Sequence, residues 1–153
     1  AKADYARRLG AYATIDYTTQ KVGEQALALT DDRGVDRVVD LIGGAMTAQN
    51  IIASARGGHI LQVSTLDGSD TQVPLRTLMS KQLTISGSTL RPQTAQTKKA
   101  IADRIRTDLL PPLSAPGFTK PMVTALPLAE AAQAHRLMES RTHMGKIVLV
   151  MPQ

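Results

Sequence analysis

The sequence contains no cysteine, no tryptophan and one phenylalanine. Without thiols the chain forms no disulfide framework, no thiolate metal site and no cysteine nucleophile, and it suits a reducing compartment. The scarcity of aromatic rings leaves little to stack on nucleic-acid bases. No apolar run reaches the ~18 residues that a membrane-spanning helix needs. We therefore expect a cytoplasmic protein that has no membrane as a partner.

Basic residues outnumber acidic ones by a modest margin, with 18 Lys and Arg against 13 Asp and Glu in 153 residues, for a net charge of +5. Such an excess attracts nucleic acids, phosphates and anionic surfaces. The basic residues are scattered, however, as in Arg7-Arg8 and Lys98-Lys99, and they form no long block. We therefore expect solvated faces and no nucleic-acid partner. A non-catalytic module that dimerises or binds RNA stays open as an alternative.

Short apolar strands and amphipathic helices alternate along the first part of the chain. In Val35–Ile42, the apolar pairs Val38-Val39 and Leu41-Ile42 flank Asp40, and this nearly continuous apolar run is typical of a strand buried on both faces of a parallel sheet. Alternation of this kind with short loops predicts right-handed β-α-β units and an α/β fold. The expected strands are Thr14–Tyr17, Val35–Ile42, His59–Ser64 and Leu83–Gly87, and the expected helices are Ala3–Leu9, a helix capped by Thr18 or Thr19, Ala45–Ala55 and Leu75–Lys81.

The pattern changes at Arg91-Pro92. We expect a longer helix over residues 93–109, which Pro111-Pro112 ends, followed by a loop over 113–121. A strand at 122–126, a helix at 128–141 and a strand at 145–151 complete the chain. This tail is predicted as an α+β segment without further β-α-β repetition. The sequence therefore predicts two parts, residues 1–91 and 92–153.

The best-placed candidate sites are the loops that follow the strands, because ligands of open α/β sheets bind beyond the carboxyl ends of the strands. The loops at Gly43-Gly44, Ser64–Ser69 and Ser88–Arg91 hold such positions and are expected to line one crevice. For Gly43-Gly44, a simple turn of the chain is at least as good an interpretation. Asp40 either bonds to neighbouring backbone or accepts from a ligand hydroxyl, and the sequence leaves both open.

No catalytic constellation is evident. The chain has three histidines, His59, His135 and His143. None of them has a second histidine or a carboxylate at metal-ligand spacing. The sequence contains neither Gly-x-Gly-x-x-Gly nor a P-loop. We therefore assign no catalytic residue and no metal.

Several stretches, taken in order, match one known pattern: Leu9-Gly10-Ala11 with Ile15-Asp16-Tyr17, Val38-Val39-Asp40 before Gly43, Gly57-Gly58-His59-Ile60, Leu83–Arg91, Ala132–Glu139 and Gly145–Leu149. In these stretches the chain resembles the medium-chain dehydrogenase/reductase superfamily, and within it the zinc-free, zeta-crystallin-like quinone oxidoreductases. The resemblance covers essentially the whole chain. It implies that residues 1–91 are an incomplete dinucleotide-binding (Rossmann) domain and that residues 92–153 return to a catalytic domain absent from this chain.

The resemblance also implies NADPH as the cofactor and gives particular residues a role in binding it. Lys2 and Tyr17 would hold the 2′-phosphate, since an ammonium and a phenol both donate hydrogen bonds to phosphate. Leu41 and Ile42 would border the adenosine. The remaining cofactor-binding candidates are Val63, Ser64 and Thr65 on the nicotinamide side, and Arg91 and Lys146 beside the cleft.

The implied chemistry is hydride transfer from NADPH to a quinone or activated alkene, without zinc. A related alternative is an enoyl-thioester reductase, because the same scaffold and hydride donor serve both. Family members often dimerise through edge strands, and Leu83–Ser88 is the candidate edge here. Because the glycine-rich pyrophosphate turn is absent from the sequence, we expect a fragment that is inactive alone.

Overall fold

The computed structural model describes residues 1–152, which fall into two compact units. The sheet unit is Ile15–Ile105, and the tail unit combines Ala1–Thr14 with the residues from Arg106 onward. The expected division into residues 1–91 and 92–153 concerns domains of a longer protein, and it stays a prediction. No helix in the described part of the chain is long and apolar enough to cross a membrane.

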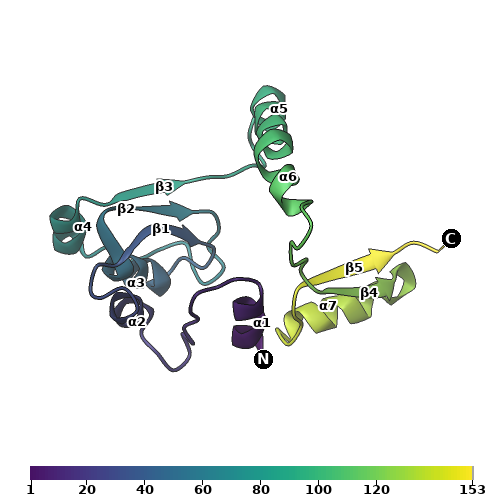
Figure 1. Ribbon diagram of the computed structural model, residues 1–153, viewed down its shortest axis with the longest axis horizontal. Coiled ribbons are helices and arrows are strands. Elements are labelled where there is room, and N and C mark those ends of the chain that lie inside the picture. The colour runs from purple at the N-terminus through teal and green to yellow at the C-terminus, as the bar shows by residue number, and fades with distance from the viewer. Residues whose placement is uncertain (153) are drawn as a thin grey trace. The chain divides into compact units, whose positions relative to one another are not determined.

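The sheet unit is built on three parallel strands in the order β1-β2-β3 (Figure 1). Val38, Ile60 and Ile85 are neighbours across them. The strands and helices of this unit are α2 (Val22–Ala28), β1 (Val35–Asp40), α3 (Ala45–Ala53), β2 (Ser54–Gln62), α4 (Leu75–Lys81), β3 (Thr84–Gly87) and α5 (Ala95–Arg104). The parallel α/β arrangement predicted from the sequence is confirmed.

The core of the sheet unit lies where α3 packs on the sheet. Ile51 of α3 and Ile60 of β2 are completely buried, and each contributes about 1.5–3 kcal/mol through removal from water. The neighbouring helix α2 packs on α3 through Gly23, where a Cβ atom would lie 2.8 Å from the Cβ of Ile52. Only glycine permits this approach of the two helices.

The predicted end of the helix at residue 55 and the predicted start of the next strand at residue 59 are both wrong. α3 ends at Ala53 and β2 begins at Ser54, with no loop between them. Val35 pairs with Ser54 whereas Arg37 pairs with His59, so β2 carries extra residues as a bulge. Gly57, at φ 73°, belongs to this bulge. The glycines there mark an irregular strand and not a helix end.

Lys81 closes the carboxyl end of α3. Its Nζ donates hydrogen bonds to the carbonyl oxygens of Ile52, at 2.6 Å, and Ser54, at 2.7 Å. These bonds satisfy carbonyls that a helix terminus leaves without intrahelical partners. Burial lowers the pKa of the Lys81 ammonium. The side chain thereby joins the end of α4 to the helix-to-strand junction.

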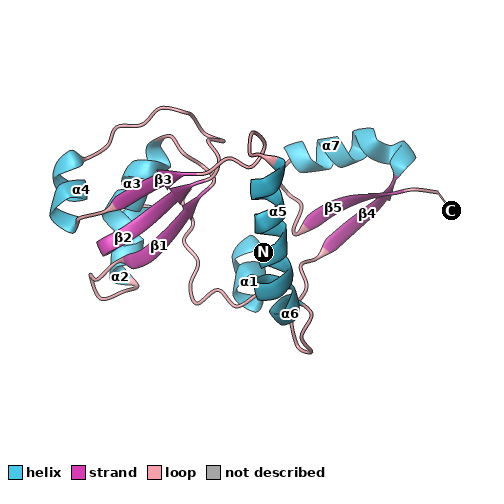
Figure 2. Ribbon diagram, turned by 90° about the horizontal axis from the view of Figure 1, so that it is seen from above, coloured by secondary structure: helices cyan, strands magenta, loops and turns pink. Residues whose placement is uncertain are grey.

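The tail unit contains one β-α-β arrangement, contrary to the expectation that this repetition had ended. β4 (Val123–Pro127) and β5 (Lys146–Val150) are parallel, and α7 (Ala131–Glu139) connects them (Figure 2). α1 (Lys2–Arg8) belongs to the same unit, where the Tyr5 hydroxyl accepts a hydrogen bond from the Met122 N–H at 2.7 Å.

Two further expectations are wrong. In the described part of the chain no strand pairs with Thr14–Tyr17, so these residues form no strand, and the chain turns at Tyr17. Pro111-Pro112 does not end the helical run. A π-helical turn (Ile105–Leu109) leads from α5 into α6 (Leu110–Leu113), and the prolines occupy the first turn of α6, where their missing N–H groups are not needed.

Candidate functional site: a crevice beyond the parallel strands

A crevice lies at the carboxyl ends of β2 and β3 in the sheet unit. It consists of two adjoining pockets of about 620 and 580 Å³ that share Val63, Ser88 and Thr89. This is the position at which ligands bind in open α/β sheets. The other lining residues are Gln62, Ser64, Thr65, Gly87, Leu90, Arg91, Pro92 and Gln93.

The loop after β1 is held by the carboxylate of Asp40, which is only 3% exposed. One oxygen accepts from the backbone N–H groups of Ile42, at 2.7 Å, and Gly43, at 3.0 Å. The other accepts from Asn50 Nδ2, at 2.9 Å, and the Thr47 hydroxyl, at 3.3 Å, both on α3. Of the two roles left open by the sequence, the structure shows the backbone one: Asp40 fixes the loop that carries Leu41 and Ile42.

Gly43 and Gly44 let this loop approach the loop after β2. A Cβ on Gly43 would lie 2.7 Å from the carbonyl oxygen of Gly68, and one on Gly44 would lie 2.9 Å from that of Asp67. Both glycines also have positive φ values. The Gly44 N–H donates to Gly68 O at 3.1 Å. The pair therefore does more than turn the chain, since it allows the two loops to touch.

Gln62, the last residue of β2, connects the ends of neighbouring strands. Its side-chain Nε2 donates to the carbonyl oxygens of Ser64, at 2.6 Å, and Asp40, at 3.3 Å. Its own carbonyl accepts from the Ser88 N–H at 3.0 Å. The sequence analysis missed this residue. The available signal was a polar side chain directly after the apolar pair Ile60-Leu61 at the end of β2.

The crevice brings together four of the predicted site residues, namely Val63, Ser64, Thr65 and Arg91. Leu41 and Ile42 directly follow β1 in the same unit, and their side chains are 54% and 37% exposed. These exposed side chains can contact an apolar part of a ligand at the end of β1, although they do not line the two pockets.

The other predicted residues lie elsewhere. Lys2 on α1 and Lys146 at the start of β5 belong to the tail unit, where Lys2 Nζ donates to the carbonyl oxygen of Arg141. Tyr17 belongs to the sheet unit, and its side chain is 65% exposed. The structure thus assigns Lys2 and Tyr17 to different compact units.

Tyr17 sits on a turn that Asp16 organises. The Asp16 carboxylate accepts from the Thr18 hydroxyl, at 2.6 Å, and from the Thr18 N–H, at 3.0 Å. These two bonds stabilise the charged form and lower the pKa of Asp16. The turn is therefore held in place above the usual carboxyl pKa and loses this support as the pH falls through the lowered value.

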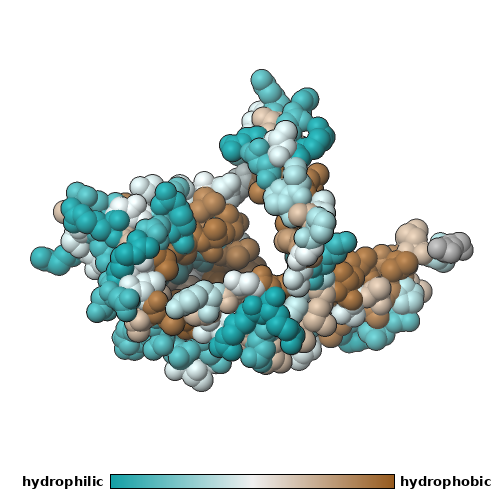
Figure 3. Space-filling view, in the orientation of Figure 1, coloured by the Kyte–Doolittle hydropathy of each residue, from teal (hydrophilic) through white to brown (hydrophobic). Residues whose placement is uncertain are grey.

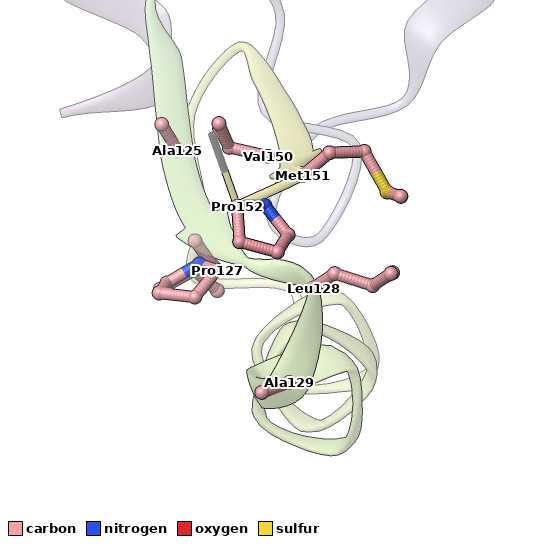
Figure 4. A pocket seen from close by; sticks show the side chains of 8 residues that line it. Ala125, Pro127, Leu128, Ala129, Val150, Met151 and Pro152 are labelled. Atoms are coloured by element: carbon pink, nitrogen blue, oxygen red, sulfur yellow. The ribbon is translucent and has the colours of Figure 1, made fainter.

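An apolar hollow of about 690 Å³ lies in the tail unit, beyond the ends of β4 and β5 (Figure 4). Its lining includes Pro127, Leu128 and Met151, and hydrophobic residues gather on the surface over β4 and β5 (Figure 3). It offers almost no polar group with which to orient a ligand. For that reason the crevice of the sheet unit is the better candidate site.

The fold and its crevice define a Rossmann-like α/β protein. Residues 9–149 match the family described as zinc-binding dehydrogenase, and the chain belongs to that family. The resemblance to the medium-chain dehydrogenase/reductase superfamily is thereby confirmed. Membership in this family of oxidoreductases implies a nicotinamide cofactor.

Two known proteins and one solved structure are similar to this chain over most of its length. The 2-haloacrylate reductase of a Burkholderia species is 30% identical over 161 residues, which cover 97% of this chain and 45% of that protein. The quinone oxidoreductase of Pseudomonas aeruginosa is 30% identical over 152 residues, covering 97% and 46%. The crystal structure of a Pseudomonas syringae quinone oxidoreductase matches with a TM-score of 0.74 at 26% identity, covering 97% and 45%. This chain spans less than half the length of these relatives.

The residues present do not fit the metal in the family's description. Within residues 1–152, no three or more His, Cys, Asp or Glu side chains are grouped to hold a metal ion. His59, a possible nitrogen ligand, instead bonds through Nε2 to the Ser86 hydroxyl at 2.6 Å. A nicotinamide cofactor fits better, because the crevice presents hydroxyl and backbone groups to a polar ligand.

Proposed function

We propose that this chain is the cofactor-binding part of an NADPH-dependent quinone oxidoreductase-like enzyme, which transfers a hydride to a quinone or an activated alkene. The observation that carries the proposal is the crevice beyond β2 and β3, which Val63, Ser64 and Thr65 help to line. Their backbone and hydroxyl groups offer the donors and acceptors that a carboxamide needs. The names of the Burkholderia and Pseudomonas relatives support both kinds of substrate.

The cofactor, when bound, supplies the hydride, and the chain positions it and excludes water. Leu41 and Ile42 provide apolar contact for the adenosine, and the buried Asp40 keeps their loop in place. Arg91, on the crevice wall, offers a guanidinium to a phosphate or carboxylate. Lys146 is proposed to offer a second cation.

The preference for NADPH rests, in this proposal, on Lys2 and Tyr17. Both are hydrogen-bond donors toward a 2′-phosphate, and the ammonium adds a charge that NADH cannot use. Tyr17 is exposed and carried by the turn at Asp16. Lys2 must exchange the Arg141 carbonyl for the phosphate when the cofactor binds.

Calorimetric titration of NADPH and NADH into the 153-residue chain tests the proposal. We expect NADPH to bind at least about tenfold more tightly, because a charge-assisted bond to phosphate contributes about 1.5–3 kcal/mol. Tyr17→Phe should reduce this preference severalfold by removing only a hydroxyl. Tyr12→Phe is the matched control, since Tyr12 is 92% exposed and has no assigned role. Equal affinities for the two nucleotides would contradict the phosphate site, and failure to bind either would contradict a nucleotide site in this chain.

An enoyl-thioester reductase is the second candidate function. The 2-haloacrylate reductase relative is named for an activated alkene, and an enoyl thioester is another substrate of that class. In an assay of NADPH oxidation we expect no turnover by this chain alone with either a quinone or an enoyl thioester. The sequence lacks the glycine-rich turn that places a pyrophosphate at a helix N-terminus.

A further inference from the structure

Gln62 occupies the point where the ends of the three strands meet. In the register of the sheet it lies opposite Asp40 on β1 and Gly87 on β3. Its carbonyl accepts from Ser88, beyond β3, and the Val63 N–H donates to Asp40 O at 2.9 Å. The main chain at Gln62 therefore already holds the strand ends together, and the side chain adds to this at the loops.

The orientation of the Gln62 amide follows from its partners. Carbonyl oxygens only accept hydrogen bonds, so the group between Asp40 O and Ser64 O must be the donating NH₂. Its two hydrogens match the two acceptors. One acceptor, Asp40 O, belongs to the last residue of β1, and the other, Ser64 O, lies in the loop after β2. A single side chain therefore links the strand end from which the first loop leaves to the second loop.

The loops that Gln62 joins are also paired with each other farther out. The Asp67 N–H donates to Ile42 O at 2.8 Å, the Leu66 N–H to Leu41 O at 3.4 Å, and the Gly44 N–H to Gly68 O at 3.1 Å. These three bonds lie farther along the loops, whereas the Gln62 side-chain bonds lie where the loops leave the sheet. Loss of the Gln62 side chain would leave the main-chain bond from the Val63 N–H to Asp40 O as the link at the point where the loops leave the sheet.

We propose that Gln62 is a positioning residue of the crevice: its side-chain amide ties the end of β1 at Asp40, from which residues 41–44 leave the sheet, to Ser64 in the loop of residues 63–68, and so sets the spacing between the two loops. Such a role acts on a ligand indirectly, through the placement of Leu41, Ile42 and the 63–65 backbone. The part of this inference that concerns nucleotide binding rests on the proposed function. The part that concerns the two loops does not.

Amide hydrogen exchange on the intact chain tests the loop role directly. Gln62→Met removes both donors and keeps a side chain of similar length. We expect the protection of the Gly44, Leu66 and Asp67 amides to fall about tenfold, while Ile60 and Leu61 within β2 keep theirs. Gln62→Glu retains the shape but sets a carboxylate against two carbonyl oxygens, so it should lower the same three protections at least as much.

Gln93→Met is the matched control. Gln93 lines the same crevice, but its Nε2 donates to Thr89 O, within its own loop, at 3.0 Å. This variant should leave the three amides unchanged. Wild-type protection in both Gln62 variants would overturn the proposal. A uniform loss that includes Ile60 and Leu61 would also overturn it, because it would show a general contribution to stability.

A nucleotide titration separates this inference from the proposed function. Gln62→Met should weaken NADPH and NADH by a similar factor, about tenfold, and leave their ratio unchanged, because the 2′-phosphate contacts are elsewhere. If the wild-type chain binds neither nucleotide, the proposed function fails, whereas the hydrogen-exchange result still decides the role of Gln62. If both nucleotides bind Gln62→Met as tightly as the wild type, the positioning of the cofactor by Gln62 is wrong.

Discussion

The side chain of Asp40 is buried in the sheet unit, where its carboxylate accepts hydrogen bonds from four donors. A buried carboxylate is tolerated only when its hydrogen-bonding capacity is satisfied. Two of the donors belong to the backbone of the next loop and two to α3. The residue therefore converts the end of a strand into a rigid starting point for the loop that follows.

Asp40→Asn tests this arrangement. The asparagine NH₂ would face N–H donors in place of an oxygen acceptor, so we expect a loss of about 2 kcal/mol in the free energy of unfolding. Urea denaturation measures it. Asp36→Asn, on the exposed face of the same strand, is the control and should change the urea midpoint little, because exposed ion pairs contribute little. Similar midpoints for both variants would contradict the role given to Asp40.

The candidate site could be predicted from the sequence only in part. The positions of Val63, Ser64 and Thr65 followed from the resemblance and from the rule that sites lie beyond parallel strands. Gln62 could not be found in this way, because its role depends on two carbonyl groups, one of them 22 residues earlier. The partners of Lys2 were likewise unpredictable, since Arg141 is remote in sequence.

At the scale of helices and strands, the alternating pattern predicted the order of β1, α3, β2, α4 and β3 correctly. It failed where local signals are ambiguous. A glycine pair often marks the end of a helix. In this chain, however, pairing with β1 makes Gly57 and Gly58 part of a bulged strand. A short stretch such as Thr14–Tyr17 contains β-branched and aromatic residues that are typical of strands, but it becomes a strand only where a partner strand is available.

The junction of α3 and β2 gives a second prediction. Lys81→Met removes both hydrogen bonds to the carbonyls of Ile52 and Ser54, and we expect a loss of about 1–2 kcal/mol in unfolding free energy. Thermal denaturation followed by circular dichroism provides the measurement. Lys99→Met is the control, because Lys99 is an exposed residue of α5 that forms a surface ion pair with Asp103 in the next turn. If the Lys99 variant lost as much stability as the Lys81 variant, the junction bonds would not be the cause.

For the molecule as a whole, the proposed partner is a second copy of the chain. β3 is an edge strand of the described sheet, and it pairs with β2 alone. The Ser88 N–H points toward β2, where it donates to Gln62 O. Because successive N–H groups of a strand point in opposite directions, that of Gly87 points to the free edge.

Gly87→Pro therefore tests dimerisation through β3. Proline removes the outward N–H without breaking a bond to β2, so we expect sedimentation equilibrium to show a dimer for the wild type and a monomer for the variant. Gly87→Ala is the matched control and should remain dimeric, since a Cβ there meets no atom within 4 Å. A monomeric wild type, or a dimeric proline variant, would exclude pairing through this edge.

The direct passage from α3 into β2 also bears on how this chain can change in evolution. With no connecting residues between Ala53 and Ser54, an insertion there would shift the strand against β1 and displace its end, and with it the crevice. Length changes in related chains should therefore be rare across residues 53–62. They should gather in segments such as 114–121, which belong to no helix or strand.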